Sequence, residues 1–170
     1  MDIYKGQGIW VAVAGRSSGA IVIEDSVFED CGLGGAQIGY GLALVTGDAP
    51  LRVARNVIRG ANFAGIIVIK PGAETVIEEN TIVTGPGDVE PRYGGNGIHL
   101  LGAWKKVQDA PVIIRRNEMT VEGAEAEGVH AFGDEVLNNK VQNLPVEKNN
   151  ITVSDGLAGI GLWGKSSARR

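Results

Sequence analysis

Two five-residue stretches, GIHLL at residues 97–101 and GVHAF at residues 128–132, share a glycine, an apolar residue, a histidine and two further apolar residues. They contain both histidines of the chain, and their glycines lie 31 residues apart. The same glycine-led pattern recurs without histidine as GIWVA at 8–12, GLALV at 41–45, GIIVI at 65–69 and GIGLW at 159–163. Self-similarity at this spacing indicates a repeat architecture.

A second motif lies between successive glycine-led segments and reads apolar-x-apolar-x-x-Asn-x-apolar. Its instances are IVIEDSVF at 21–28, LRVARNVI at 51–58, TVIEENTI at 75–82, VIIRRNEM at 112–119 and LPVEKNNI at 144–151. Ser26 replaces the asparagine in the first, and Thr75 replaces the leading apolar residue in the third. The period-two alternation predicts that each motif is a short strand, and no segment shows sustained helical periodicity.

Stacking of these units predicts the fold. A unit with two or three short strands cannot bury its own apolar face, whereas stacked units share one core. The chain is therefore predicted to be an all-β parallel β-helix, a solenoid, with one domain over residues 1–170. Neither end carries a cap, so the chain is expected to be a section of a longer protein or to have its ends sealed by neighbours.

The glycine-led strands and asparagine turns over residues 8–163 resemble the right-handed parallel β-helix of the pectin-lyase-like superfamily. The resemblance implies a solenoid of about five to six coils and an extracellular or periplasmic location. That superfamily includes lyases, hydrolases, epimerases, phage tailspikes and non-catalytic surface proteins, so the resemblance implies no single activity. The paired-Asp, Gly-His-Gly and Asp-Pro-His signatures of its polygalacturonase-like hydrolases and uronan epimerases are absent.

Composition limits the partners. The net charge of −4 and the pI of about 5.2 argue against a nucleic-acid or anionic-membrane partner. No apolar run approaches the roughly 18 residues of a membrane span. The first ten residues, MDIYKGQGIW, lack the basic and apolar regions of a signal peptide, so none is expected in this sequence. The single cysteine, Cys31, excludes an internal disulfide and is interpreted as a buried thiol.

Two polar columns are expected along the stack. The first is a structural ladder of amide side chains that hydrogen-bond along the axis and support the turns; its members are Ser26, Asn56, Asn80, Asn117 and Asn149. The second contains the residue before each of these, with charges of alternating sign over most of its length: Asp25, Arg55, Glu79, Arg116 and Lys148. This column is interpreted as an ion-pair ladder, with a solvated charged edge as the alternative.

The histidines belong to a third column. Residues one and three after each glycine are apolar and should face the core, so the residue two after it should point outward. His99 and His130 would then stack on adjacent coils of one outer face. The residues four after glycine, including Phe132, are also apolar, so we expect this face to be covered by loops, a subunit, a further domain or a ligand. Sugar rings stack on such aromatic surfaces.

The long loops beside the histidines supply the other candidate site residues. The catalytic candidates are His99, His130, Tyr93, Arg92, Lys105 and Asp88, and the substrate-binding candidates are Trp104, Lys106, Asp109 and Phe132. A uronate lyase needs a cation for the carboxylate and a base for the C5 proton. A glycoside hydrolase would instead use a carboxylate pair chosen from Asp88, Glu90, Asp109 and Glu127.

Three functional interpretations follow. The first is a carbohydrate-interacting domain that resembles the polysaccharide lyases and hydrolases, with its cleft on coils four and five. The second is a non-catalytic structural or adhesive repeat whose apolar face is an oligomer or domain interface. The third is a periplasmic metal-associated β-helix with a divalent cation on His99, His130 and a glutamate. No other cofactor is indicated.

Overall fold

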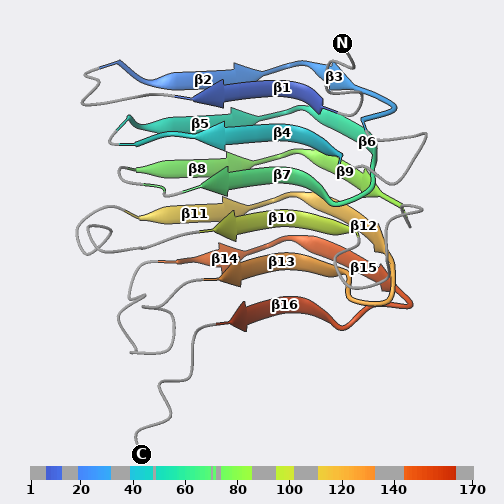
Figure 1. Cartoon of the computed structure of the whole chain (residues 1–170). Coiled ribbons are helices and arrows are strands. Elements are labelled where there is room, and N and C mark those ends of the chain that lie inside the picture. Colours follow the sequence, from blue (N-terminus) through green and yellow to red (C-terminus); the bar gives the residue numbers. More distant parts are fainter. Residues whose placement is uncertain are drawn as a thin grey trace, which may run out of the picture.

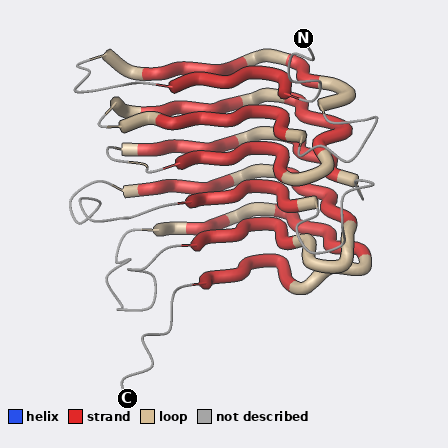
Figure 2. Tube along the Cα trace, in the orientation of Figure 1, coloured by secondary structure: helices blue, strands red, loops and turns tan. Residues whose placement is uncertain are grey.

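Strands and turns make up the described part of the chain. The computed structural model describes residues 7–12, 19–31, 39–47, 49–69, 71, 74–85, 95–101, 111–132 and 144–163. These residues contain no helix (Figure 2), which confirms the all-β prediction. Within them, therefore, there is no helix of the length and apolarity that a membrane crossing needs.

The strands form three parallel sheets that run the length of the molecule (Figure 1). Sheet A contains β1 (Gln7–Ala12), β4 (Tyr40–Val45), β7 (Ala64–Ile69), β10 (Asn96–Leu101), β13 (Glu127–Phe132) and β16 (Ala158–Trp163). Sheet B contains β2 (Ile21–Glu24), β5 (Leu51–Ala54), β8 (Thr75–Glu78), β11 (Val112–Arg115) and β14 (Val146–Glu147). Sheet C contains β3 (Val27–Phe28), β6 (Val57–Ala61), β9 (Thr81–Thr84), β12 (Glu118–Glu122) and β15 (Asn150–Ser154).

Each strand pairs in parallel with the equivalent strand of the neighbouring repeat. In sheet A, for example, Ile66 lies beside Ile98 and Ile98 beside Val129. The chain therefore passes through sheets A, B and C in turn before it returns to sheet A, as in a parallel β-solenoid. The predicted stacking of strands from successive repeats is confirmed.

The asparagine motif forms two strands, where the sequence predicted one. Strand β5 ends at Ala54 and β6 begins at Val57, and the intervening Arg55 has a φ of 54°. The equivalent residues of the other repeats also have a positive φ, between 54° and 57°; they are Asp25, Glu79, Arg116 and Lys148. This left-handed conformation turns the backbone from sheet B into sheet C. The alternation of apolar and polar residues did not predict this corner, because it depends on side-chain polarity and carries no information on the backbone angle.

The core lies inside the three sheets. In the four inner strands of sheet A, the residues one and three after the glycine are fully buried, as predicted: Leu42, Leu44, Ile66, Val68, Ile98, Leu100, Val129 and Ala131. In β1 the equivalent Ile9 and Val11 are only partly buried. Ile160 and Leu162 of β16 were expected to be buried as well, but they are 47% and 54% exposed. The reason is that β16 is the last strand of sheet A and pairs with β13 alone among the described strands.

The motif glycines of all repeats before the last described one are needed for close packing between repeats; they are Gly8, Gly41, Gly65, Gly97 and Gly128. A Cβ atom on Gly65 would collide with Ile82 Cγ2 and would lie 2.9 Å from the carbonyl oxygen of Gly97. A Cβ on Gly97 would lie 2.6 Å from the carbonyl oxygen of Gly128. Both distances are shorter than real Cβ contacts, so a side chain here would push successive repeats apart.

The amide side chains form a continuous hydrogen-bonded column. Asn56 Nδ2 donates to Asn80 Oδ1 at 3.0 Å, Asn80 Nδ2 donates to Asn117 Oδ1 at 2.9 Å, and Asn117 Nδ2 donates to Asn149 Oδ1 at 2.9 Å. Ser26 joins through its backbone N–H, which donates to Asn56 Oδ1 at 3.1 Å. Each corner is therefore bonded to the corner of the next repeat, which fixes the register of the stack.

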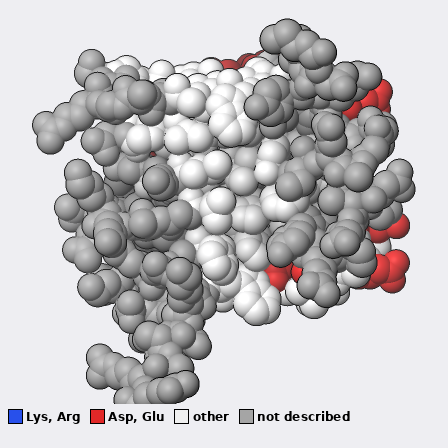
Figure 3. All heavy atoms as spheres, viewed as in Figure 1, with Lys and Arg blue, Asp and Glu red and all other residues white. Residues whose placement is uncertain are grey.

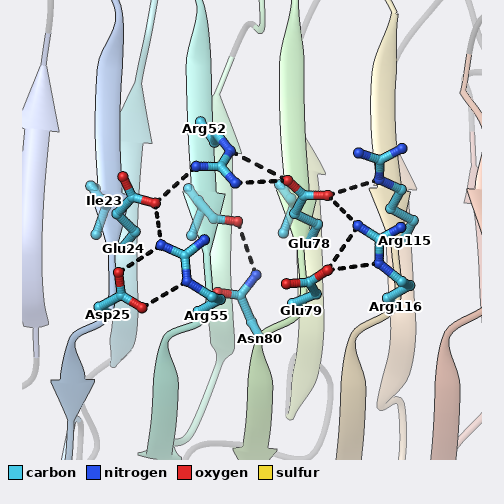
Figure 4. Close-up of polar contacts among 12 residues, drawn as sticks. Ile23, Glu24, Asp25, Arg52, Arg55, Glu78, Glu79, Asn80, Arg115 and Arg116 are labelled. Atoms are coloured by element: carbon cyan, nitrogen blue, oxygen red, sulfur yellow. Dashed lines mark hydrogen bonds and ion pairs between the residues drawn. The ribbon is translucent and has the colours of Figure 1, made fainter.

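Ion pairs cross sheet B on its outer face (Figure 4). The predicted column contributes contacts of Arg55 with Asp25 at 2.6 Å and of Arg116 with Glu79 at 2.8 Å. A second row of ion pairs, not predicted from the sequence, lies beside it, and in it Arg52 contacts both Glu24 at 2.8 Å and Glu78 at 3.0 Å. Arg115 and Arg116 also contact Glu78, at 2.8 and 2.9 Å.

We predict that Asn80→Ala lowers the free energy of unfolding by roughly 1–3 kcal/mol, because the buried backbone N–H of Asn56 loses its acceptor and the Val53 carbonyl loses the amide that donates to it. Urea unfolding followed by circular dichroism measures the loss. Asn149→Ala is the matched control, because Asn149 is only partly buried and water can replace its contacts. An equal loss in both variants would contradict a ladder stabilised by burial.

We also predict that stability falls as the pH drops below 4.5, and that Glu78→Gln weakens this dependence. Burial raises the pKa of Glu78, but hydrogen bonds from Arg115 and Arg52 outweigh burial and hold the pKa below its usual 4.5. A lowered folded-state pKa stabilises the protein above pH 4.5, and this contribution disappears as the carboxylate is protonated. Thermal unfolding between pH 3 and pH 7 measures it; identical acid slopes in both proteins would refute it.

Candidate functional site

An open groove of about 580 Å³ lies on the outer side of sheet A. Its floor is formed by the residues two after the motif glycine, Ile67, His99 and His130, which the register aligns across β7, β10 and β13. Side chains at or before the strand starts and at the strand ends complete the lining: Tyr40, Phe63, Asn96, Glu125, Glu127 and Leu157 on one side, and Leu101, Phe132 and Trp163 on the other.

The two histidine rings stack on adjacent strands. His99 and His130 are register partners, and their ring centroids lie 4.5 Å apart. The stack continues in both directions, with Phe63 at 5.5 Å from His99 and Trp163 at 6.5 Å from His130. The groove therefore has a floor of aromatic and imidazole rings that crosses the strands of sheet A.

Glu127, the first residue of β13, holds His130 in place. Its side chain is 1% exposed, and its Oε2 lies 2.8 Å from His130 Nδ1. Its other oxygen, Oε1, accepts a hydrogen bond from Trp163 Nε1 at 2.8 Å. A carboxylate in its ordinary ionised form can only accept hydrogen bonds. His130 Nδ1 therefore carries a hydrogen toward Glu127.

Gly161 makes room for this carboxylate. It occupies the floor position on β16, directly beside His130 on β13. A Cβ atom on Gly161 would collide with all three atoms of the Glu127 carboxyl group. The missing side chain thus leaves the space in which Glu127 reaches both His130 and Trp163.

The pairing sets the chemistry of His130. With Nδ1 bonded to Glu127, Nε2 is the ring nitrogen left to exchange a proton with a bound molecule. The side chain is 21% exposed at the groove, so a ligand can reach it. A carboxylate that orients an imidazole in this way is the arrangement of general acid–base catalysts.

His99 has a different state. Burial of the ring, with a further contribution from nearby His130, lowers the pKa of His99 to about 3. The imidazole is therefore neutral around pH 7 and cannot act as an acid or a charged ligand there. Its side chain is 7% exposed and is packed between Phe63 and His130.

The structure brings three of the predicted site residues together. His99, His130 and Phe132 line the groove. The remaining predicted residues lie outside the described part of the chain; they are Tyr93, Arg92, Lys105 and Asp88 of the catalytic set, and Trp104, Lys106 and Asp109 of the binding set. Glu90, a candidate for a carboxylate pair, also lies outside it.

The sequence analysis missed the role of Glu127, although it named this residue as a hydrolase candidate. Two signals were present. Glu127 immediately precedes its motif glycine, as Asn96 precedes Gly97, whereas the same position on β4 and β7 is Tyr40 and Ala64. A glycine also interrupts the floor column next to His130. Tyr40 and Phe63 were missed because no pattern connects them to the groove.

We predict that Gly161→Ala displaces the Glu127 carboxylate and breaks its bonds to His130 and Trp163. Leaving this buried carboxylate without its donors should cost roughly 1–3 kcal/mol of stability. Chemical unfolding and the tryptophan emission spectrum measure the change. Gly159→Ala on the same strand is the matched control, because a Cβ there meets nothing within 4 Å. Equal effects of the two substitutions would argue against the assigned place of Glu127.

The geometry of the groove is the basis on which a function can be proposed for this chain. No protein-family model, curated protein or solved structure matches this chain. Among the described residues, no group of three or more His, Cys, Asp or Glu side chains is placed to hold a metal ion. The metal-associated interpretation therefore finds no donor set in that part of the chain.

Proposed function

We propose that this chain is a carbohydrate-interacting solenoid domain whose substrate groove is the ring-lined groove of sheet A. The observation that carries the proposal is the Glu127–His130 pair in the floor of a groove walled by aromatic side chains. We propose further that the solenoid is right-handed, has about five to six coils and is related to the pectin-lyase-like proteins. An extracellular or periplasmic location is part of the same proposal.

The lining of the groove supports a sugar ligand. Carbohydrates present apolar C–H faces that pack on aromatic rings, and Phe132 and Trp163 are 38% and 47% exposed at the groove. Tyr40 and Phe63, whose centroids lie 5.3 Å apart, form the opposite wall. A volume of about 580 Å³ is in the range of small-molecule sites and accommodates a few sugar rings.

The Glu127–His130 pair supports a chemical role for the groove. His130 Nε2 can take a proton from a sugar carbon, a sugar hydroxyl or a water molecule, while Glu127 stabilises the imidazolium that forms. Proton transfer of this kind serves both elimination and hydrolysis of a glycosidic bond. The two reactions give different products, an unsaturated sugar in the first and a new reducing end in both.

A non-catalytic repeat with an apolar interface is the second candidate. It is favoured by the apolar side chains that the end of sheet A exposes, with Ile160, Leu162 and Leu157 between 47% and 57% exposed. Exposed apolar residues that lie close together at the edge of a sheet mark contact surfaces. Light scattering after gel filtration tests it, since an interface between copies would give a dimer or larger assembly.

A panel of polysaccharides tests the leading proposal. We predict turnover by the wild type, measured as new reducing ends and as absorbance of unsaturated uronates. Glu127→Gln should lower the rate about 10²- to 10⁴-fold, the usual contribution of a positioned acid–base group. The substitution keeps the side-chain volume but removes the charge that orients His130.

Glu118→Gln on β12 is the matched control, because Glu118 is exposed on sheet C, away from the groove. It should retain the wild-type rate. Equal activity in the Glu127 variant and the wild type would remove the catalytic role from the pair. A folded wild type that neither binds nor converts any polymer of the panel would refute the proposal and favour the interface.

A further inference from the structure

The amide of Asn96 has a defined orientation. The backbone N–H of Glu127 donates to Asn96 Oδ1 at 2.9 Å. In an amide side chain only the oxygen can accept a hydrogen bond from an N–H group, so Asn96 Oδ1 faces Glu127 and Asn96 Nδ2 points away from it. Asn96 Nδ2 lies 3.5 Å from His99 Nδ1. The NH₂ group carries two hydrogens and no lone pair for a hydrogen bond, so it acts as the donor to His99.

This orientation selects one tautomer of His99. A ring nitrogen that accepts a hydrogen bond cannot carry a hydrogen, and the buried imidazole is neutral at pH 7. The single ring hydrogen of His99 is therefore on Nε2. This atom is buried and has no hydrogen-bond partner. Among the described residues that line the groove, His99 Nε2 is the buried side-chain polar atom that lacks a hydrogen-bond partner.

His130 presents the opposite hydrogen-bonding character. Its Nδ1 donates to Glu127, so in the neutral ring Nε2 has a lone pair and no hydrogen. The floor of the groove thus holds a donor on His99 and, when the His130 ring is neutral, an acceptor on His130, with ring centroids 4.5 Å apart. Adjacent sugar hydroxyls match such a pair, because one can accept from His99 while its neighbour donates to His130.

The charges of the groove favour an uncharged sugar. Among its described lining residues, the only groups of formal charge at pH 7 are the carboxylates Glu125 and Glu127. In the same view as Figure 1, the space-filling surface of Figure 3 shows uncharged side chains down the middle of the molecule and no lysine or arginine among the described atoms. A uronate would meet carboxylates of its own sign there, whereas a neutral hydroxyl-rich ring would not.

We propose that the groove binds a neutral sugar through two adjacent hydroxyl groups, one accepting from His99 Nε2 and the other donating to His130 Nε2. The inference rests on the proposed carbohydrate function and adds the substrate class. Nε2 of His99 is buried, so a sugar hydroxyl reaches it after a neighbouring side chain turns.

Imidazole nitrogen NMR of the unliganded protein tests the tautomer without any ligand. We expect the His99 signals of a ring protonated on Nε2 alone, unchanged between pH 8 and pH 5. The titratable groups around this ring are His130, Glu127, Glu125 and Tyr40. Asn96→Asp keeps the acceptor for Glu127 but replaces the donor to His99, so it should move a hydrogen onto Nδ1. A wild-type His99 protonated on Nδ1 would overturn the inference.

Titration with defined oligosaccharides tests the ligand class. Xylo-, manno- and cello-oligosaccharides are the neutral probes, and oligogalacturonate is the charged one. We expect a neutral probe to bind more tightly than oligogalacturonate and to shift the His99 Nε2–H signal. His99→Phe, which keeps a ring against Phe63 but removes the donor, should weaken binding about 3- to 10-fold. His99→Gln, which retains an N–H donor, should lose less.

The outcomes separate the two proposals. A probe that binds in the groove without moving the His99 signal, or a preference for oligogalacturonate, would overturn this inference and leave the carbohydrate function standing. Failure of every oligosaccharide to bind the folded protein would overturn both.

Discussion

The register between successive repeats is the constraint on which the rest of the structure depends. The asparagine column bonds each corner to the next, and the motif glycines let the sheet A strands approach closely. In a parallel stack a slip of one residue would turn the core-facing side chains of a strand outward. Because the register holds, residues that are far apart in sequence, such as His99 and His130, become neighbours on one face.

The groove arises where this regular stack is interrupted. The floor position is apolar on β4 and β7, becomes histidine on β10 and β13, and is glycine on β16. The glycine creates the space that the Glu127 carboxylate fills, and Trp163 on the same strand satisfies its second oxygen. Burial of a carboxylate is costly, and the contacts with His130 and Trp163 offset part of that cost here. The acid–base role proposed for His130 would depend on this contact.

Much of the fold was predictable because its determinants repeat. Two alternating motifs gave the strands, the parallel stacking and the amide column from Ser26 to Asn149. The corner at Arg55 was not predictable from polarity, because a left-handed backbone angle leaves little trace when the residue is charged. The site was predictable only in part. His99 and His130 share a motif position, but the contacts of Glu127 depend on the missing side chain of Gly161, which is three-dimensional information.

Cysteine cross-linking measures the register directly. Strands in one sheet lie about 4.8 Å apart, within the span that a disulfide bridges. The variant with His99→Cys and His130→Cys should form a disulfide between these positions on mild oxidation, identified by peptide mass spectrometry. The variant with His99→Cys and Phe132→Cys, displaced by two residues along β13, should not. Cross-linking of residue 99 to residue 132 in place of 130 would contradict the register and, with it, the groove.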